Sequence, residues 1–263
     1  MDALQASLVA GGAFLAGGMN AMAGGGTFFS FPALLAAGVP PVTANASNTV
    51  ALWPASLSSA WAYRREVTRH KTWTALLVAI SFIGGICGGL LLLAISNAAF
   101  SRLVPWLLLV ATTLFAFSSQ VSRLVAAFKS RIGLGAAKNR TGTPGGLGGL
   151  LFQLVVAVYG GFFGAGMGIL TLAALSIQGV EDIQELNGLK NLTSAVNYTV
   201  AAATFVIAGA ISWPHTLIML ATALAGGYAG ASLARRLPAL WLRRFVVAVG
   251  GALTVIYFAK TYL

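Results

Sequence analysis

Charged residues are scarce in this chain of 263 residues, where Asp, Glu, Lys and Arg make up 8% of positions and hydrophobic residues 58%. A soluble domain carries about 25% charged residues. With so few charges, the chain cannot cover its surface with solvated groups, which excludes an ordinary soluble fold. Its outer surface is therefore expected to face lipid. We predict a multi-pass protein of a bacterial-type inner (cell) membrane.

The residue types that usually carry out catalysis or bind metals are also few. The sequence has five acidic residues, two histidines and one cysteine, Cys87. It contains no HExxH motif, no pair of carboxylates inside an apolar run and no Cys/His cluster. A lone cysteine also excludes an intramolecular disulfide. We therefore predict that the chain is not an enzyme and that it uses no cofactor and no metal ion.

Long apolar runs dominate the sequence. Each is nearly free of charge and close to the roughly 20 residues that a helix needs to cross the hydrocarbon layer. Because lipid cannot hydrogen bond to the backbone, such runs are expected to be helices. The predicted fold is therefore an all-α integral membrane protein. The six runs are 42–63, 73–96, 103–128, 192–209, 214–234 and 245–259.

The net charge of +11 would suit a nucleic-acid-binding protein, but the positions of the basic residues contradict that interpretation. Twelve of the 16 Lys and Arg residues lie in three short connections, 64–71, 129–140 and 235–244. Short connections rich in Lys and Arg are typical of cytoplasmic loops. We therefore expect all three in the cytoplasm, and we expect a lipid bilayer and no nucleic acid as the partner.

Two related halves are predicted, membrane repeats at residues 1–128 and 147–263, joined by a basic cytoplasmic linker at 129–146. Each half has a glycine-rich break, a Gly-Val step, a polar helix start with Asn, a Trp and a Gly-Gly-x-x-Gly motif, in the same order and at nearly the same spacing. The matching positions are 23–27 and 160–168, 37–39 and 178–180, Asn48 and Asn191, Trp73 and Trp213, and 84–88 and 226–230.

The charges also constrain the number of membrane crossings. If the three basic connections share one side, the crossings between the second and the third must be even in number. The apolar runs between them are 147–178, 189–210 and 214–234. The first run must then enter and leave on the same side, which its glycine break permits if two half-length helices form a re-entrant hairpin.

The same argument applied to residues 3–38 puts both termini outside. It predicts two inverted repeats, each a glycine-broken re-entrant helix hairpin plus three spanning helices, as in many secondary transporters. The alternative is eight crossings, in which each first run spans the membrane and one basic connection lies outside.

The glycine breaks are the first candidate binding site. A short helix is expected to begin after each break, and a helix N-terminus offers free N–H groups and the positive end of its dipole to an anion. Glycine lets the backbone approach a ligand without interference from a Cβ atom. The alternative is that these glycines only pack helices. The candidate residues are Gly24, Gly25, Gly26, Thr27, Gly166 and Gly168.

Polar residues at helix starts are the second candidate. Ionisable groups inside a membrane segment usually face a cavity, and Lys190 is predicted to neutralise a bound anion. The alternatives are a lysine that snorkels to the interface and an ion pair with Glu181, Asp182 or Glu185. The other candidates are Asn45 and Asn48 in the first half and Asn187 and Asn191 in the second, where Ser194 and Asn197 continue the same helical face.

Two further amides, Asn20 and Gln153, lie within the predicted hairpins. Each is expected either to line the site or to be satisfied by packing.

Four motifs are typical of one family: residues 24–27 with Pro32, residues 45–49, Arg64-Arg65, and residues 187–192. In these motifs the chain resembles the TauE/SafE sulfite exporter family, over nearly its whole length. The resemblance implies a secondary transporter, expected to be an exporter, of small anions such as sulfite, organosulfonates or carboxylates. These anions would bind at the midplane between broken helices. Protons are expected to be co-transported or counter-transported, and the oligomeric state is left open. The alternatives are a passive anion channel and a membrane scaffold without transport.

Overall fold

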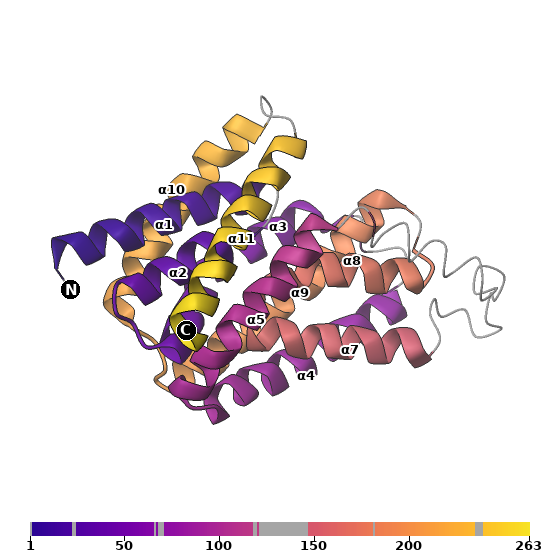
Figure 1. Cartoon of the computed structure of the whole chain (residues 1–263). Coiled ribbons are helices and arrows are strands. Elements are labelled where there is room, and N and C mark those ends of the chain that lie inside the picture. The colour runs from indigo at the N-terminus through magenta and orange to yellow at the C-terminus, as the bar shows by residue number, and fades with distance from the viewer. Residues whose placement is uncertain are drawn as a thin grey trace.

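The computed structural model describes residues 2–22, 25–65, 67, 71–117, 120, 147–180, 182–234 and 239–263. These residues form helices and no strands, which confirms the all-α prediction for this part of the chain. Gly24 and the predicted linker at 129–146 lie outside the described residues. The helices in Figure 1 are α1 Ala3–Met22, α2 Thr27–Ala36, α3 Pro41–Ala62, α4 Lys71–Ala94, α5 Asn97–Ala116, α7 Leu147–Phe162, α8 Met167–Ile177, α9 Ile183–Ile207, α10 Trp213–Ala234 and α11 Ala239–Tyr262.

Three helices of the described part are long and apolar enough to cross a membrane: α4, α5 and residues Trp241–Tyr262 of α11. Helices α3, α9 and α10 have comparable lengths of 22, 25 and 22 residues. At 1.5 Å per residue these lengths correspond to about 33 to 38 Å. The six predicted runs correspond to these six helices. Helix α9 begins well before its predicted run at 192–209, because its first turns are polar.

The first glycine break reverses the chain. A Cβ atom added to Gly12 of α1 would collide with Ala33 of α2, and one added to Gly26 would collide with the Ala16 carbonyl of α1. Because residues early in α1 lie beside residues late in α2, the two helices form an antiparallel hairpin.

The second break does the same. A Cβ atom on Gly149, early in α7, would meet Gln178 just after α8, and one on Gly160 would meet Met167 at the break. Helices α2, α7 and α8 have 10, 16 and 11 residues, as expected for short hairpin helices. The expectation of a half-length helix is wrong for α1, which has 20 residues. The Asp2 carboxylate accepts a hydrogen bond from the Gln5 N–H at 2.7 Å and thereby caps the N-terminus of this longer helix.

Each hairpin packs against a long helix of the other half. Helix α1 lies along α10, and α7 lies along α4. A Cβ atom on Gly17 or Gly226 would collide with backbone across the first seam, and one on Gly88 or Gly161 would collide with backbone across the second. Small residues let helices approach this closely. The Gly-Gly-x-x-Gly motifs of the sequence therefore serve helix packing.

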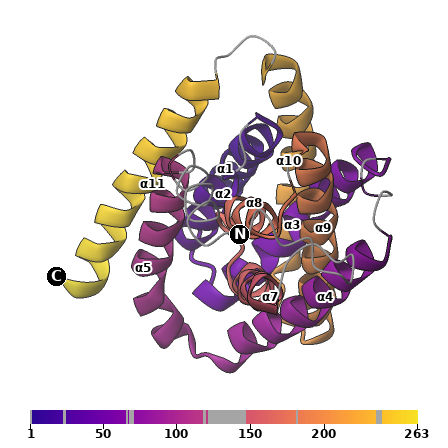
Figure 2. The same ribbon diagram turned by 90° about the vertical axis from the view of Figure 1, so that its right-hand side faces the viewer.

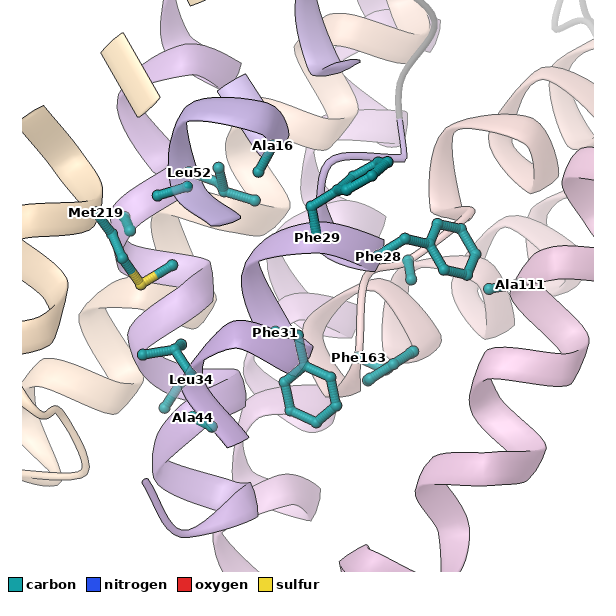
Figure 3. Packing of buried hydrophobic residues seen from close by; sticks show 14 of the residues in the cluster. Ala16, Phe28, Phe29, Phe31, Leu34, Ala44, Leu52, Ala111, Phe163 and Met219 are labelled. Atoms are coloured by element: carbon teal, nitrogen blue, oxygen red, sulfur yellow. The ribbon is translucent and has the colours of Figure 1, made fainter. Parts of the chain in front are cut away.

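Phenylalanine rings of α2 occupy the centre of the core, as Figure 3 shows for Phe28, Phe29 and Phe31. Phe31 is fully buried and packs edge-on against Phe163, with ring centroids 5.6 Å apart. Phe28 and Phe31 also pack against rings of α5, and Phe29 stacks on Phe245 of α11. The short helix is therefore held between elements of both halves of the molecule.

Helices α5 and α11 form one edge of the molecule. In Figure 2 they run side by side, apart from α3, α4, α9 and α10, with the two hairpins in between. The Arg243 side chain of α11 donates to the carbonyls of Phe115 at 2.9 Å and Ala116 at 2.5 Å. A basic side chain at this place satisfies free carbonyls at the C-terminus of α5 and fixes the end of α5 beside the first break.

Candidate functional site: a cavity at the glycine breaks

A cavity of about 870 Å³ lies where the two glycine breaks face α3, α9 and α10. A volume in this range suits a small-molecule site. The structure places six of the predicted site residues on its wall, two from the first half of the chain and four from the second. They are Gly25, Thr27, Gly166, Gly168, Lys190 and Asn191.

The cavity occupies one half of the molecule's depth. Helix α3 contributes residues from Ala51 to Ser59, and Tyr63 follows at the end of the helix. Helix α5 contributes Phe115, one residue before its end, and α9 contributes residues from Lys190 to Tyr198. The cavity therefore extends from the breaks toward the C-terminal ends of α3 and α5.

The second break presents an open helix N-terminus to this cavity. Gly166 precedes α8 in the left-handed conformation, with φ of 78°, which glycine adopts without steric cost. The Met167 and Ile169 N–H groups donate to the carbonyls of Gly164 and Gly166 at 3.1 and 3.0 Å. Among the described residues, no side chain accepts a hydrogen bond from the first turn of α8. Its dipole therefore faces the cavity without a polar cap.

The first break also contains a left-handed glycine, one residue farther from its helix, but it is closed by side chains. Gly25 has a φ of 83°, and the Gly26 N–H donates to Asn20 Oδ1 at 2.8 Å. Asn20 thus supplies the cap that α8 lacks, and it also lines the cavity. A Cβ atom on Gly25 would lie 2.9 Å from Phe115 Cζ, so this break is already in contact with α5.

Lys190 extends from α9 across the start of α8. A Cβ atom placed on Gly168 would lie 3.7 Å from Lys190 Cδ, so the aliphatic part of the lysine rests against this glycine. Of the described residues that line the cavity, Lys190 is the only one with a charged side chain. The Asp182 carboxylate accepts the Gln184 and Glu185 N–H groups at 2.8 and 3.1 Å as the N-cap of α9, which accounts for its position without Lys190.

Three predicted asparagines make structural bonds and are absent from the described wall of the cavity. Asn45 Nδ2 donates to the Phe162 carbonyl at 2.8 Å. Asn48 Oδ1 accepts from the Ser30 hydroxyl at 2.5 Å. Asn187 Nδ2 donates to the carbonyl one turn earlier in α9, at 2.9 Å. Asn45 and Asn48 are buried and tie α3 to the end of α7 and to α2.

Other predicted positions have similar packing roles. Gly26 is buried at the first break and does not belong to the described wall. Asn197, on the same α9 face as Lys190, donates to the Ala157 carbonyl at 2.7 Å. Gln153 is buried in α7, and its Oε1 has no hydrogen-bond partner among the described residues.

The sequence interpretation missed several residues of the wall. Tyr198 lies four residues after Ser194 and eight after Lys190, and both Ser194 and Tyr198 line the cavity. Its helical spacing from Lys190 is the signal that would have found it. Ser56 and Phe115 also line the cavity, but their approach depends on tertiary packing that no local pattern indicates.

A cluster of aromatic rings lies on the far side of the breaks from the cavity. Phe100 packs against Phe162 and Phe31 with ring centroids 5.6 and 6.4 Å apart, and Phe31 packs against Phe163. None of the four lines the cavity. Phe100 lies in the first turn of α5 and Phe115 in the last, about 22 Å apart along this helix, whereas Phe163 directly precedes Gly164 on the cavity wall. The cavity is therefore separated from the opposite side of the molecule by packed rings.

Sequence comparisons identify relatives along nearly the full chain. The family described as sulfite exporter TauE/SafE matches residues 9–257. A probable membrane transporter protein of Haemophilus influenzae is 28% identical over 244 residues, covering 92% of this chain and 89% of that protein. The probable membrane transporter protein YfcA of Escherichia coli is 24% identical over 247 residues, covering 92% and 85%. The probable membrane transporter protein ORF9 of a Sinorhizobium species is 25% identical over 248 residues, covering 92% and 88%.

No solved structure matches the chain. The family match covers nearly all of the sequence. The relatives of the chain are named as membrane transporters and not as enzymes. Three helices of the described part of the chain are long and apolar enough to cross a bilayer. The chain therefore belongs to the sulfite exporter TauE/SafE family and is a multi-pass membrane transporter.

Proposed function

We propose that this protein is a secondary transporter, most readily an exporter, of small anions such as sulfite, organosulfonates or carboxylates, in a bacterial-type inner membrane. The anion binds in the cavity at the N-terminus of α8. Family membership supports transport, and the chemistry of the cavity supports an anion. A free sulfonate or carboxylate would meet the positive end of a helix dipole and a cation on the same wall.

The observation that carries this proposal is the position of Lys190. Its side chain rests on Gly168 in the first turn of α8, and no described carboxylate lines the same cavity. A positive charge without an opposing charge in a low-dielectric space attracts an anion more strongly than it would in water. Snorkelling to the interface, the alternative role, would instead carry the ammonium away from the helix terminus.

We further propose that residues 1–128 and 147–263 are inverted repeats joined by a cytoplasmic linker at 129–146. Glycines with positive φ support this proposal. Gly38 and Gly179 each stand two residues after the second hairpin helix, and Gly25 and Gly166 each stand within two residues before it. The packing between the halves supports it as well. Helix α1 of the first half packs on α10 of the second, and α7 of the second half packs on α4 of the first. Inverted repeats of this kind exchange access between two sides of a membrane.

The packed rings favour a carrier over a passive channel. A channel needs a continuous path, whereas Phe31, Phe100, Phe162 and Phe163 fill the space beyond the breaks. The cavity extends toward the connection at 64–71, the side that the basic residues assign to the cytoplasm. An exporter loads its substrate from that side. The described cavity wall has no carboxylate to relay protons, so a proton that accompanies transport would travel on the anion itself.

The test is sulfite flux into liposomes that contain the purified protein, compared between wild type and Lys190→Gln. We expect saturable flux in the wild type and a KM for sulfite at least about tenfold higher in the variant, which corresponds to about 1.4 kcal/mol of binding. Lys190→Arg is expected to retain part of the affinity, because the charge remains while its geometry changes.

Lys260→Gln is the matched control, because it removes an exposed lysine at the end of α11 outside the cavity wall. It should leave KM unchanged. Equal KM values in Lys190→Gln and wild type would contradict the role of Lys190. Flux that fails to saturate would indicate a channel, and the absence of flux for sulfite, methanesulfonate and acetate would indicate a protein without anion transport.

A further inference from the structure

Tyr198 occupies the point where the two hairpins and α9 meet. Its hydroxyl lies beside the side chain of Thr27, the first residue of α2. A Cβ atom placed on Gly164, in the second break, would lie 3.2 Å from the same hydroxyl oxygen. Tyr198 and Thr27 both line the cavity. One side chain of α9 therefore touches the breaks of both halves at the floor of the cavity.

The Tyr198 hydroxyl lies deeper than the charge of Lys190. The two residues are eight positions apart on α9, or about 12 Å along its axis, and they lie on one face of the helix. Lys190 begins this polar face and Tyr198 ends it at the breaks. An anion that enters from the side of Lys190 reaches the hydroxyl last.

The hydroxyl pair retains a donor for this anion. Each hydroxyl has one O–H and can accept further hydrogen bonds. A hydrogen bond between the two hydroxyls would use one of the two O–H groups and leave the other free to donate. Hydrogen bonds from a neutral donor to an ionised oxygen are stronger than those between neutral groups. The pair can therefore donate to an oxyanion.

We propose that the Tyr198 hydroxyl is a specificity-determining hydrogen-bond donor to the transported oxyanion, held in place by Thr27 at the junction of the two hairpins. The proposal rests on the proposed function, because it concerns the same cavity and substrate. It assigns the charge to Lys190 and the recognition of an anion oxygen to Tyr198. The second half supplies the tyrosine, and the equivalent region of α3 contributes Ser56 to the same wall.

A second tyrosine provides a structural control. Tyr159 of α7 donates its O–H to the Ala165 carbonyl at 2.6 Å, so it also holds the second break. Tyr159 does not belong to the described wall of the cavity. Loss of its hydroxyl should weaken the break without removing a donor to the substrate, whereas loss of the Tyr198 hydroxyl should do the reverse.

The experiment measures sulfite uptake by liposomes containing wild type, Tyr198→Phe, Tyr159→Phe or Thr27→Val. We expect Tyr198→Phe to raise KM for sulfite at least about tenfold with the maximal rate within about twofold of wild type, a loss equal to about 1.4 kcal/mol. Tyr159→Phe should lower the unfolding temperature and leave KM within about twofold. Thr27→Val should raise KM by only about threefold, since Tyr198 keeps its own O–H.

A KM in Tyr198→Phe that stays within about twofold of wild type would overturn the assignment while leaving the anion transporter intact. An equal rise in KM for Tyr159→Phe would also overturn it, because both effects would then come from the geometry of the break. A wild-type protein without saturable sulfite, methanesulfonate or acetate flux would contradict the proposed function itself, and with it this assignment.

Discussion

The two glycine breaks each contain a left-handed glycine but have different surroundings. Gly25 and Gly166 have φ values of 83° and 78°, and each stands just before a short helix. Around the first break, the Asn20 side chain caps Gly26 and the Phe115 ring lies against Gly25. Around the second, a Cβ atom on Gly166 would have its nearest neighbour at 3.4 Å, and Lys190 rests on Gly168. Both breaks therefore face α5, the first more tightly and with an amide on Gly26, and the second with a cation on Gly168.

This difference shows how a repeated backbone can be given two roles by a few side chains. Both breaks need glycine because the left-handed conformation costs other residues about 1 to 2 kcal/mol. Asn20 accepts the hydrogen bond of the Gly26 N–H at the start of α2, so this N–H group is no longer available to a ligand. In the second half, a lysine rests on Gly168 and adds a positive charge. We infer that the first break mainly holds the helices in position and that the second break mainly binds the anion.

The largest effect is expected in a test of the inverted repeat, because each labelled cysteine reacts either from one side of the membrane or from the other. Single cysteines replace Lys71, Ala98 or Arg244, three exposed positions, in a Cys87→Ser background. We expect positions 71 and 244 to react from the cytoplasmic side and position 98 from the outside. Two spanning helices precede the second hairpin and two follow it, so an even number of crossings separates 71 from 244. The measurement is labelling by an impermeant maleimide in right-side-out and inverted vesicles.

Position 98 serves as the internal control, since one helix, α4, separates it from position 71. If positions 71 and 244 react from opposite sides, the second hairpin contains a full crossing. The two breaks would then no longer be equivalent, and the eight-crossing alternative would hold.

A smaller effect is expected from filling the second break. We expect Gly166→Leu to abolish sulfite transport while the protein still inserts, because the new side chain would start 3.4 Å from Leu114 of α5 and push the break, which lines the cavity, out of place. The matched control is Gly179→Leu. Gly179 has a φ of 97° with nothing within 4 Å of an added Cβ atom, so it carries the backbone cost of about 1 to 2 kcal/mol without filling the cavity. Flux per inserted protein and thermal unfolding are the two measurements.

Gly179→Leu should lose stability and keep its transport rate. Equal loss of transport in both variants would mean that backbone strain alone inactivates the protein, and the open second break would lose its significance. Gly25→Leu should also abolish transport, but with a larger loss of stability, because its side chain would displace the Phe115 ring.

Much of the fold could be predicted from the sequence because its determinants are local. Six apolar runs become six long helices, since lipid leaves the backbone no other hydrogen-bond partner. The breaks at Gly25 and Gly166 could be predicted because glycine permits a conformation that other residues avoid. The length of α1 was not predictable from the break alone, because a hairpin requires a reversal of the chain and not two helices of equal length.

The candidate site was predictable only in part, for a physical reason. Lys190 stands out because a cation in an apolar segment is costly unless a cavity or partner accommodates it. Asparagines carry no such signal, since an amide is equally suited to a ligand and to a backbone carbonyl. Asn45 and Asn48 prove to bond to Phe162 and Ser30. Tyr198 escaped notice because its neighbours, Thr27 and Gly164, come from other parts of the chain.

The smallest expected effect concerns the cap of the first break. Asn20→Ala removes the acceptor for the buried Gly26 N–H, and loss of a helix cap costs about 1 kcal/mol. For a chain of this size, that cost lowers the unfolding temperature by about 2 to 4 °C. KM for sulfite should change by less than about twofold, because the anion is bound at α8 and not at α2.

The Asn20→Asp variant distinguishes the role of Asn20 in capping α2 from its role on the wall of the cavity. It keeps an oxygen acceptor for Gly26, so the unfolding temperature should return toward that of the wild type. Its carboxylate, however, stands on the wall of the cavity that contains Lys190, and the opposing charge should weaken the attraction for an anion. If Asn20→Ala alone raised KM as strongly as Lys190→Gln does, the amide would be a ligand. The two breaks would then share the substrate, and the contrast between a positioning break and a binding break would fail.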